Sequence, residues 1–207
     1  MVAKRPVRNL LGLAVLSYLT ERPMHPYEIG ELLVARDHAR SIKYNRGSLY
    51  MVVNQLVRAG LIEAQATIRD SERPERTVYA LTGAGRGELF DWLRELIGQP
   101  AHEYPQFVAA LSLIGALHPD EVVALLRRRQ AALEQQRAEI TESVTACLAQ
   151  GLHPLFQVEE NYRLAILEAE LAFVARFITD ITDPETGWGP EWAAHHARRD
   201  PAAASEP

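Results

Sequence analysis

The sequence lacks the features that mark several classes of protein. Of its 207 residues only Cys147 is a cysteine, so neither a disulfide framework nor a cysteine-based metal cluster is expected. No apolar run approaches the roughly 18 residues that a membrane-spanning helix needs. Basic residues precede an apolar segment near the N-terminus, but no cleavage site of a signal peptide follows. These absences predict a cytoplasmic protein.

Short catalytic motifs are also missing. The HExxH motif of zinc proteases, the GxSxG motif of serine hydrolases and the phosphate-binding loop do not occur. Residues 83–87 are rich in glycine, but a dinucleotide-binding fingerprint needs another glycine where Glu88 stands. We therefore expect no enzymatic activity and no cofactor.

The histidines raise a metal sensor as an alternative. Five of them would have to converge in space: His25, His38, His102, His118 and His153. No metal-ligand spacing supports this, and a lone histidine is more often structural or on the surface. We expect no metal site.

An excess of positive charge is absent as well, since the formal net charge is −5. The charge is uneven along the chain. Residues 1–99 carry 14 basic and 11 acidic residues, whereas residues 100–207 carry 8 and 16. A mildly basic front half and an acidic back half indicate two regions with different functions.

Four helices are predicted in the front half. Apolar residues at helical spacing place them at 9–20, 26–36, within 45–60 and at 83–97. Pro23 ends the first helix, and Pro26 suits the first position of the second. Asn45 and Thr82 can cap the third and fourth helices, and Gly60 lies where a left-handed terminator belongs.

The third predicted helix has two contrasting faces. An apolar stripe should face the core: Leu49, Val52, Val53, Leu56 and Val57. The opposite face carries Met51, Asn54 and Arg58, flanked by Tyr50, and it has no acidic residue. An amide, a guanidinium and a phenol can read base edges and contact phosphates. The alternative is an ordinary amphipathic surface helix.

Two strands are predicted at 61–68 and 77–81, separated by a polar loop at 69–76 that carries three arginines. Three helices followed by such a hairpin make a winged helix-turn-helix, in which the third helix enters the major groove. The arginine-bearing loop would be the wing, which reaches the flanking DNA backbone.

Long helices are predicted in the back half, at 103–117, 120–150 and 155–181. The last has a stripe at heptad spacing: Leu164, Leu167, Leu171, Val174 and Ile178. A second stripe follows Tyr162, Ile166, Ala169, Phe173 and Phe177. Two stripes need two packing surfaces, so we expect one to face a partner subunit, and we assign the heptad stripe to dimerisation. The alternative is an antiparallel bundle within one chain.

The predicted organisation has three parts: a winged-helix DNA-binding domain at 1–98, a helical dimerisation domain at 99–182 and a disordered tail at 183–207. The fold class is mainly α with a small β-hairpin. In the tail, Trp188, Trp192, His195 and His196 are expected to be incidental to function, because the segment is rich in glycine, proline and alanine.

Several motifs together resemble the PadR family of transcriptional regulators. The matching pieces are Pro23-Met24-His25, Tyr27-Glu28-Ile29, Gly47-Ser48-Leu49-Tyr50, Leu56, Gly60-Leu61-Ile62, Arg73-Pro74 with Arg76, Tyr79-Ala80-Leu81-Thr82 with Gly85, and Trp92-Leu93. They cover residues 9–97. Residues 104–181 are similar to the virulence-activator-like C-terminal region of that family.

The resemblance implies a homodimeric repressor on a palindromic operator of double-stranded DNA. It implies that Ser48 and Tyr50 contact DNA and that Arg73 and Arg76 contact its backbone. Two positions depart from the family pattern. Pro26 stands in place of the usual glycine, and Met51 stands where proline is common. These departures concern base specificity rather than the fold.

The residues expected to contact DNA are His25, Tyr27, Lys43, Asn45, Arg46, Gly47, Ser48, Tyr50, Met51, Asn54, Arg73 and Arg76. Phe90 and Trp92 are candidates to line a pocket for a small aromatic effector, because aromatic rings stack on flat ligands. The alternative for Trp92 is core packing between the two regions. The alternative for the whole protein is a winged-helix protein–protein interaction module without DNA sequence specificity.

Overall fold

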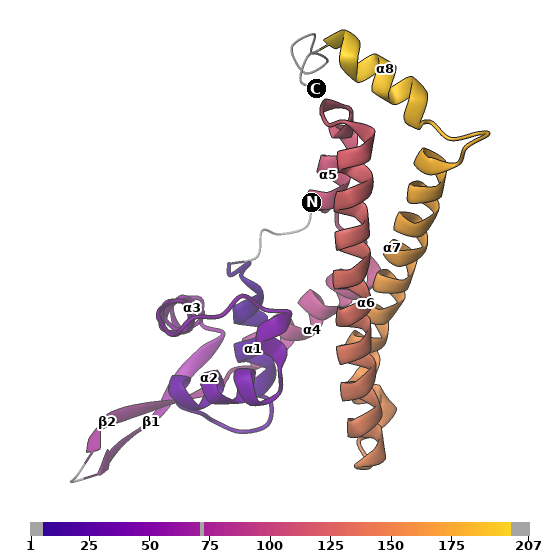
Figure 1. The fold of residues 1–207 in the computed structure, drawn as a ribbon. Helices are drawn as coiled ribbons and strands as arrows, with labels where there is room; N and C mark the ends of the chain where they lie inside the picture. Colours follow the sequence, from indigo (N-terminus) through magenta and orange to yellow (C-terminus); the bar gives the residue numbers. More distant parts are fainter. Residues whose placement is uncertain (1–5, 71–72, 200–207) are drawn as a thin grey trace. The chain divides into compact units, whose positions relative to one another are not determined.

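Most of the described residues lie in helices, with one two-stranded antiparallel hairpin (Figure 1). The computed structural model describes the backbone of residues 6–70 and 73–199 and the side chains of residues 6–65 and 77–198. The chain divides into two compact units, an N-terminal unit Met1–His102 and a C-terminal unit Glu103–Pro207. In the part described, no helix combines the length and apolar character needed to cross a membrane.

The helices of the N-terminal unit lie close to their predicted positions. They are α1 (Leu10–Tyr18), α2 (Pro26–Ala35), α3 (Arg46–Arg58) and α4 (Gly83–Gly98), with a short 3-10 helix η1 (His38–Arg40) between α2 and α3. The predicted caps are confirmed at Asn45 and Thr82, whose side chains accept hydrogen bonds from backbone N–H groups. Gly60 has φ +69° and follows α3 as predicted.

One core holds α1, α2 and α3 together. Leu11, Leu16, Ile29, Leu33 and Leu56 are fully buried in it, which withdraws five large apolar side chains from water. On α3, four residues of the predicted stripe are buried. The fifth, Val57, is 37% exposed, so that prediction was wrong. Val57 lies at the edge of the buried face, near the end of the helix.

The hairpin consists of β1 (Ile62–Asp70) and β2 (Arg73–Leu81). Its pairing runs from Ile62 opposite Leu81 to Asp70 opposite Arg73, so most of the predicted loop at 69–76 is strand. A two-stranded ribbon can carry polar residues on both faces, so the polar composition of this stretch did not exclude pairing. Met24 and Tyr79 exchange two backbone hydrogen bonds of 3.0 Å, which fasten the hairpin to the α1–α2 connection.

The C-terminal unit is built on a pair of long antiparallel helices, α6 (Pro119–Ala149) and α7 (Val158–Thr182), that run side by side (Figure 1). A short 3-10 helix η3 (Pro154–Gln157) lies between them. The single helix predicted at 103–117 is instead α5 (Gln106–Ser112) followed by η2 (Ile114–Ala116). Ser112 donates to the Ala109 carbonyl, and Gly115 has low helix propensity, so the helix ends early.

The heptad stripe of α7 packs within the chain. Leu171 and Val174 are buried in the single subunit, and Leu164, Leu167 and Ile178 are half-buried. This stripe is the predicted dimerisation surface. Its burial instead matches the intramolecular antiparallel bundle, because the short connection between α6 and α7 makes them neighbours.

The segment predicted to be a disordered tail contains a helix, α8 (Gly189–Arg199). The prediction was therefore wrong for this part, while residues 200–207 lie outside the described residues. The composition of the segment did not predict this helix, because the helix depends on a tertiary contact of Trp192. The Trp192 side chain packs on a core formed by Val122, Val123, Leu126, Val174 and Ile181. This partly buried indole contributes apolar burial that helps to offset the conformational entropy cost of ordering the eleven residues of α8.

Candidate nucleic-acid interface

The N-terminal end of α3 is held by a capping box. The Asn45 side-chain oxygen accepts from the Ser48 N–H at 2.8 Å, and the Asn45 N–H donates to the Ser48 hydroxyl at 3.2 Å. Other N–H groups of the first helical turn remain at an exposed surface, where the positive end of the helix dipole attracts anions. Because the Ser48 hydroxyl takes part in the cap, its first role is to position α3. Its contact with DNA stays a prediction.

Aromatic and basic side chains from α2 and α3 gather beside this cap. His25 caps α2, and its ring lies edge-on to the Tyr50 ring with centroids 6.4 Å apart. The Arg46 guanidinium lies 5.4 Å from the centroid of the Tyr27 ring. We call His25, Tyr27, Arg46 and Tyr50 the α3-head cluster. Sequence analysis named all four, and the fold brings them together.

The outer face of α3 is exposed and has no acidic residue. Tyr50 is 45% and Met51 57% exposed, and Asn54 is exposed one turn further on. Lys43 and Gly47 are also exposed. An acid of the neighbouring helix α2 comes close to this face: a carboxylate oxygen of Glu31 lies 3.8 Å from an Arg46 nitrogen. Both side chains are largely solvated, so this pair holds Arg46 only weakly.

The connection that leads into α3 depends on a residue that sequence analysis missed. The Tyr44 ring lies so close to Gly30 of α2 that a Cβ there would overlap the tyrosine hydroxyl. A glycine inside an apolar helical pattern was the available signal, since such a residue often marks a close approach. Gly30 therefore sets how closely α2 and the start of α3 pack.

The wing arginines lie on β2. The backbone of Arg76 is opposite Ile68, and that of Arg73 is opposite Asp70. Their side chains lie outside those that the structure describes, so their contact with the DNA backbone stays a prediction.

The two residues expected to line an effector pocket, Phe90 and Trp92, differ in how deeply they are buried. Trp92 is 4% exposed, and its ring lies near Gly12 of α1, so it packs inside the N-terminal unit. Phe90 is 43% exposed. This matches core packing for Trp92, although against α1 rather than between the two regions.

Histidines cap three helices. The sequence contains His25-Pro26, His118-Pro119 and His153-Pro154. In each pair the histidine Nδ1 accepts from the backbone N–H two residues later, at 3.1, 3.3 and 3.2 Å respectively, and the proline takes the first helical position. Among the described residues, no group of three potential ligands could hold a metal ion. The metal-sensor alternative thus finds no support in these positions.

Part of the sequence matches a known protein family, and known structures share the fold. Residues 15–91 match the transcriptional regulator PadR-like family. No match was found among curated proteins. The structure of Bacillus subtilis PadR in complex with operator DNA has a TM-score of 0.66 and 19% identity, over 83% of this chain and 98% of that chain.

Two further structures share the fold. Bacillus subtilis PadR in complex with p-coumaric acid has a TM-score of 0.64 and 18% identity, over 86% of this chain and 97% of that chain. The Vibrio cholerae virulence activator AphA has a TM-score of 0.52 and 18% identity, over 91% of this chain and 99% of that chain. At such identities the likeness concerns the fold, a winged helix followed by long helices.

Proposed function

We propose, from the premise that residues 15–91 form a PadR-like transcriptional regulator domain, that this protein is a homodimer that binds a palindromic operator. It represses transcription by occupying promoter DNA in the cytoplasm. The observation that carries the proposal is the α3-head cluster, capped and exposed on an acid-free helix. The same fold in a relative solved with operator DNA supports it.

Each part of α3 has its own task in this proposal. Arg46 and the capped N-terminus bind phosphates and set the register of the helix in the major groove. Asn54 reads a base edge, and Met51 contacts a thymine methyl group. Two such helices in a dimer would enter successive major grooves about 34 Å apart. Arg73 and Arg76 would hold the flanking backbone.

A small-molecule effector that releases the DNA is part of the proposal. A relative of the same fold was solved with p-coumaric acid, which supports the idea that such proteins take small ligands. Phe90 remains the exposed aromatic of α4 that such a ligand could stack on.

Fluorescence anisotropy with DNA from upstream of the protein's own gene tests the function. We expect the full-length protein to bind a palindrome in this DNA about 10³-fold or more tightly than a scrambled duplex of equal length. The affinity should fall steeply with salt, because phosphate contacts release counterions. A folded dimer that binds both duplexes alike would instead support the protein–protein interaction module.

The surface proposed for dimerisation lies near the α6–α7 connection. Apolar side chains there are 38–69% exposed in the single chain: Leu148, Leu152, Leu155, Phe156, Val158, Tyr162 and Ile166. Tyr162 and Ile166 belong to the second apolar stripe of α7. At this end of the helix these two residues are exposed, whereas Leu164 and Leu167 of the heptad stripe are half-buried. Such a contiguous apolar surface is typical of a subunit interface.

Replacement of Ile166 with glutamate should convert the dimer into a monomer at micromolar concentration. A carboxylate at 51% exposure is solvated in the monomer but must lose its water in the interface. Sedimentation velocity measures the result. Ala172→Glu is the control, because Ala172 is exposed and lies about 120° around the helix from Ile166. If Ile166→Glu stays a tight dimer, the interface is elsewhere.

A further inference from the structure

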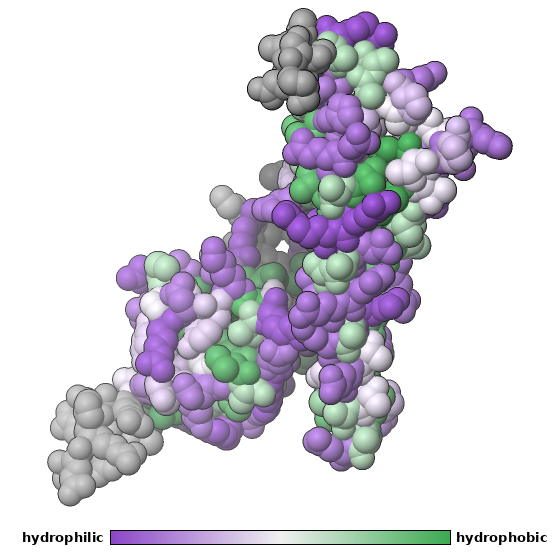
Figure 2. All heavy atoms as spheres, viewed as in Figure 1, coloured by the Kyte–Doolittle hydropathy of each residue, from purple (hydrophilic) through white to green (hydrophobic). Residues whose placement is uncertain are grey.

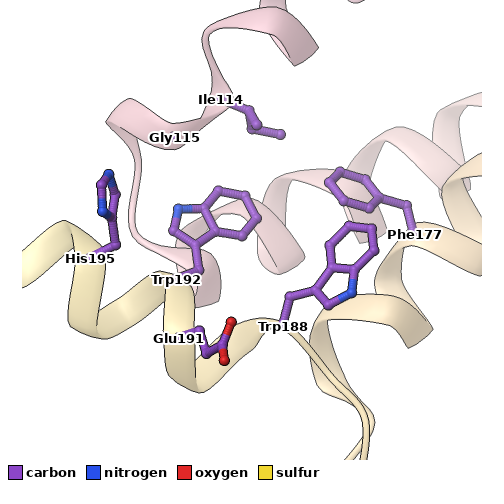
Figure 3. Close-up of a pocket in the computed structure, with 7 residues that line it drawn as sticks. All are labelled: Ile114, Gly115, Phe177, Trp188, Glu191, Trp192 and His195. Atoms are coloured by element: carbon purple, nitrogen blue, oxygen red, sulfur yellow. The ribbon is translucent and has the colours of Figure 1, made fainter.

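Helix α8 forms one wall of an open, shallow cavity that the function above does not use. The cavity has a volume of about 440 Å³ and lies between η2, the end of α7 and α8. Figure 3 shows the rings of Phe177, Trp188 and Trp192 around it, with Ile114 on one side and the Glu191 carboxylate below the two indoles. We call Phe177, Trp188, Glu191 and Trp192 the α8 cage.

The turn before α8 holds the first indole of the cage in place. The backbone N–H of Trp188 donates to the backbone carbonyl of Asp180 at 2.8 Å, and the backbone N–H of Gly187 donates to the backbone carbonyl of Asp183 at 3.0 Å. A Cβ at Gly187 would collide with the Asp183 backbone, so the turn needs glycine there. The Asp183 carboxylate accepts from the Thr186 and Glu185 N–H groups, which lowers its pKa. Trp188 is thus positioned by backbone geometry.

The other side of the cage is held by α8 itself. The His196 ring lies 3.3 Å from the Ala116 carbonyl and edge-on to the His118 ring. These contacts fasten α8 to the segment between η2 and α6. Trp192 packs on the core of the unit, and the Phe177 and Trp188 ring centroids are 5.9 Å apart. The aromatic walls therefore have fixed places before any ligand arrives.

The chemistry of the walls selects for positive charge. Trp188 is 52% exposed, which leaves indole surface open to a ligand. The faces of indole and phenyl rings attract cations, and tryptophan attracts them most strongly. Glu191 adds a carboxylate at the same opening. Of the residues that line the cavity, His195 alone has a basic side chain, and Figure 3 shows it beyond Trp192 from the other two rings.

A polar atom at the cage wall also lacks a partner. The Trp192 indole N–H is buried and has no acceptor among the residues that the structure describes. Figure 3 shows this nitrogen on the side of the indole toward His195, away from Trp188 and Phe177, so the ring faces and the Glu191 carboxylate carry the selectivity of the cage.

A neighbouring cavity shows the contrast. It has a volume of about 460 Å³, lies between α5 and α6, and is lined by Arg128 and Arg129 besides apolar side chains. Figure 2 shows the apolar surface over α5 in this region. The Arg129 guanidinium stands 3.7 Å from the Phe107 ring centroid and is paired with Glu170. The arginine side chains already supply positive charge to that cavity, whereas the α8 cage offers aromatic faces and a carboxylate.

We propose that the α8 cage is a binding site for a small organic cation of the alkylated ammonium class. The cation rests on the Trp188, Trp192 and Phe177 rings and faces the Glu191 carboxylate. The site lies wholly within the C-terminal unit, so the binding experiment needs no DNA.

Calorimetric titration of the full-length protein tests the site. Acetylcholine is the probe, and 3,3-dimethylbutyl acetate is its neutral match, in which carbon replaces the charged nitrogen. We expect the cation to bind at least tenfold more tightly. Glu191→Gln should weaken cation binding about fivefold and Trp188→Leu more than tenfold, with little change for the neutral ester in Glu191→Gln.

Glu168→Gln is the matched control, because Glu168 is an exposed carboxylate of α7 away from the cavity. It should bind the probe like the unmodified protein. Circular dichroism melting checks that each variant is folded, and Trp188→Phe keeps a ring should Trp188→Leu loosen α8. Equal affinity for both probes, or full cation affinity in Glu191→Gln, would overturn the proposal.

Discussion

Replacing Arg46 with glutamate is expected to lower the affinity for the target DNA by about 10²–10⁴-fold without unfolding the protein. Arg46 is the first residue of α3 and stands at the exposed positive end of the helix. Loss of one charge-assisted contact in each subunit costs about 1.5–3 kcal/mol. Two copies in a dimer give the expected range, because each 1.4 kcal/mol is about tenfold.

The fold should tolerate this change because of where Arg46 lies. An acidic residue in the first helical turn interacts favourably with the helix dipole, by about 0.3–1 kcal/mol at an exposed site. Proximity to Glu31 offsets part of that gain. Arg86→Glu is the control, since Arg86 is an exposed arginine near the N-terminus of α4. Anisotropy and thermal melting measure both variants, and equal losses of affinity would remove the α3-head cluster from the interface.

Replacing Gly85 with alanine is expected to destabilise the N-terminal unit by about 3 kcal/mol or more. A Cβ at Gly85 would overlap the backbone carbonyl of Leu61 and come within 2.8 Å of a Leu81 methyl. Neither neighbour can move easily. Thr82 anchors the start of α4 to the same segment, because its hydroxyl contacts the Gly60 and Leu61 carbonyls at 2.8 and 3.0 Å. Relief of the clash would therefore break the cap of α4.

Gly87→Ala is the matched control two residues later. Nothing lies within 4 Å of a Cβ at Gly87, and the residue is exposed in the helix interior. Alanine there should stabilise the unit by about 0.5–1 kcal/mol. Denaturant titration followed by circular dichroism measures both changes, with a fall of more than about 10 °C in melting temperature for Gly85→Ala. Similar stability for the two variants would show that α4 does not dock on Leu61.

The sequence was informative wherever the determinant is local. Asn45, Gly60 and Thr82 act through hydrogen bonds and dihedral angles within a few residues, so their caps could be read directly. The histidine–proline pairs were equally local, yet only Pro26 was recognised as a helix start. Histidine is not a usual cap, and the sequence pattern points to these side chains only as possible metal ligands or, for His25, as a DNA contact.

Packing partners could not be read in the same way. The heptad spacing on α7 shows that the stripe is buried, but an adjacent helix of the same chain and a partner subunit leave the same pattern. The antiparallel pairing of α7 with α6 shows that the heptad stripe packs on an adjacent helix of the same chain. For α8, the composition of the segment hid the role of Trp192, whose partial burial depends on a core assembled from α6 and α7.

The sequence alone therefore determined the order of α1 to α4 and of the hairpin between α3 and α4, the caps of α3 and α4, and the residues that make α3 an acid-free helix. These properties follow from periodicity and from contacts a few residues apart. The tertiary structure alone decided which residues meet: His25 with Tyr50, Tyr27 with Arg46, and Trp188 with Phe177. Such meetings depend on how helices pack, and packing follows from the shapes of side chains far apart in the chain.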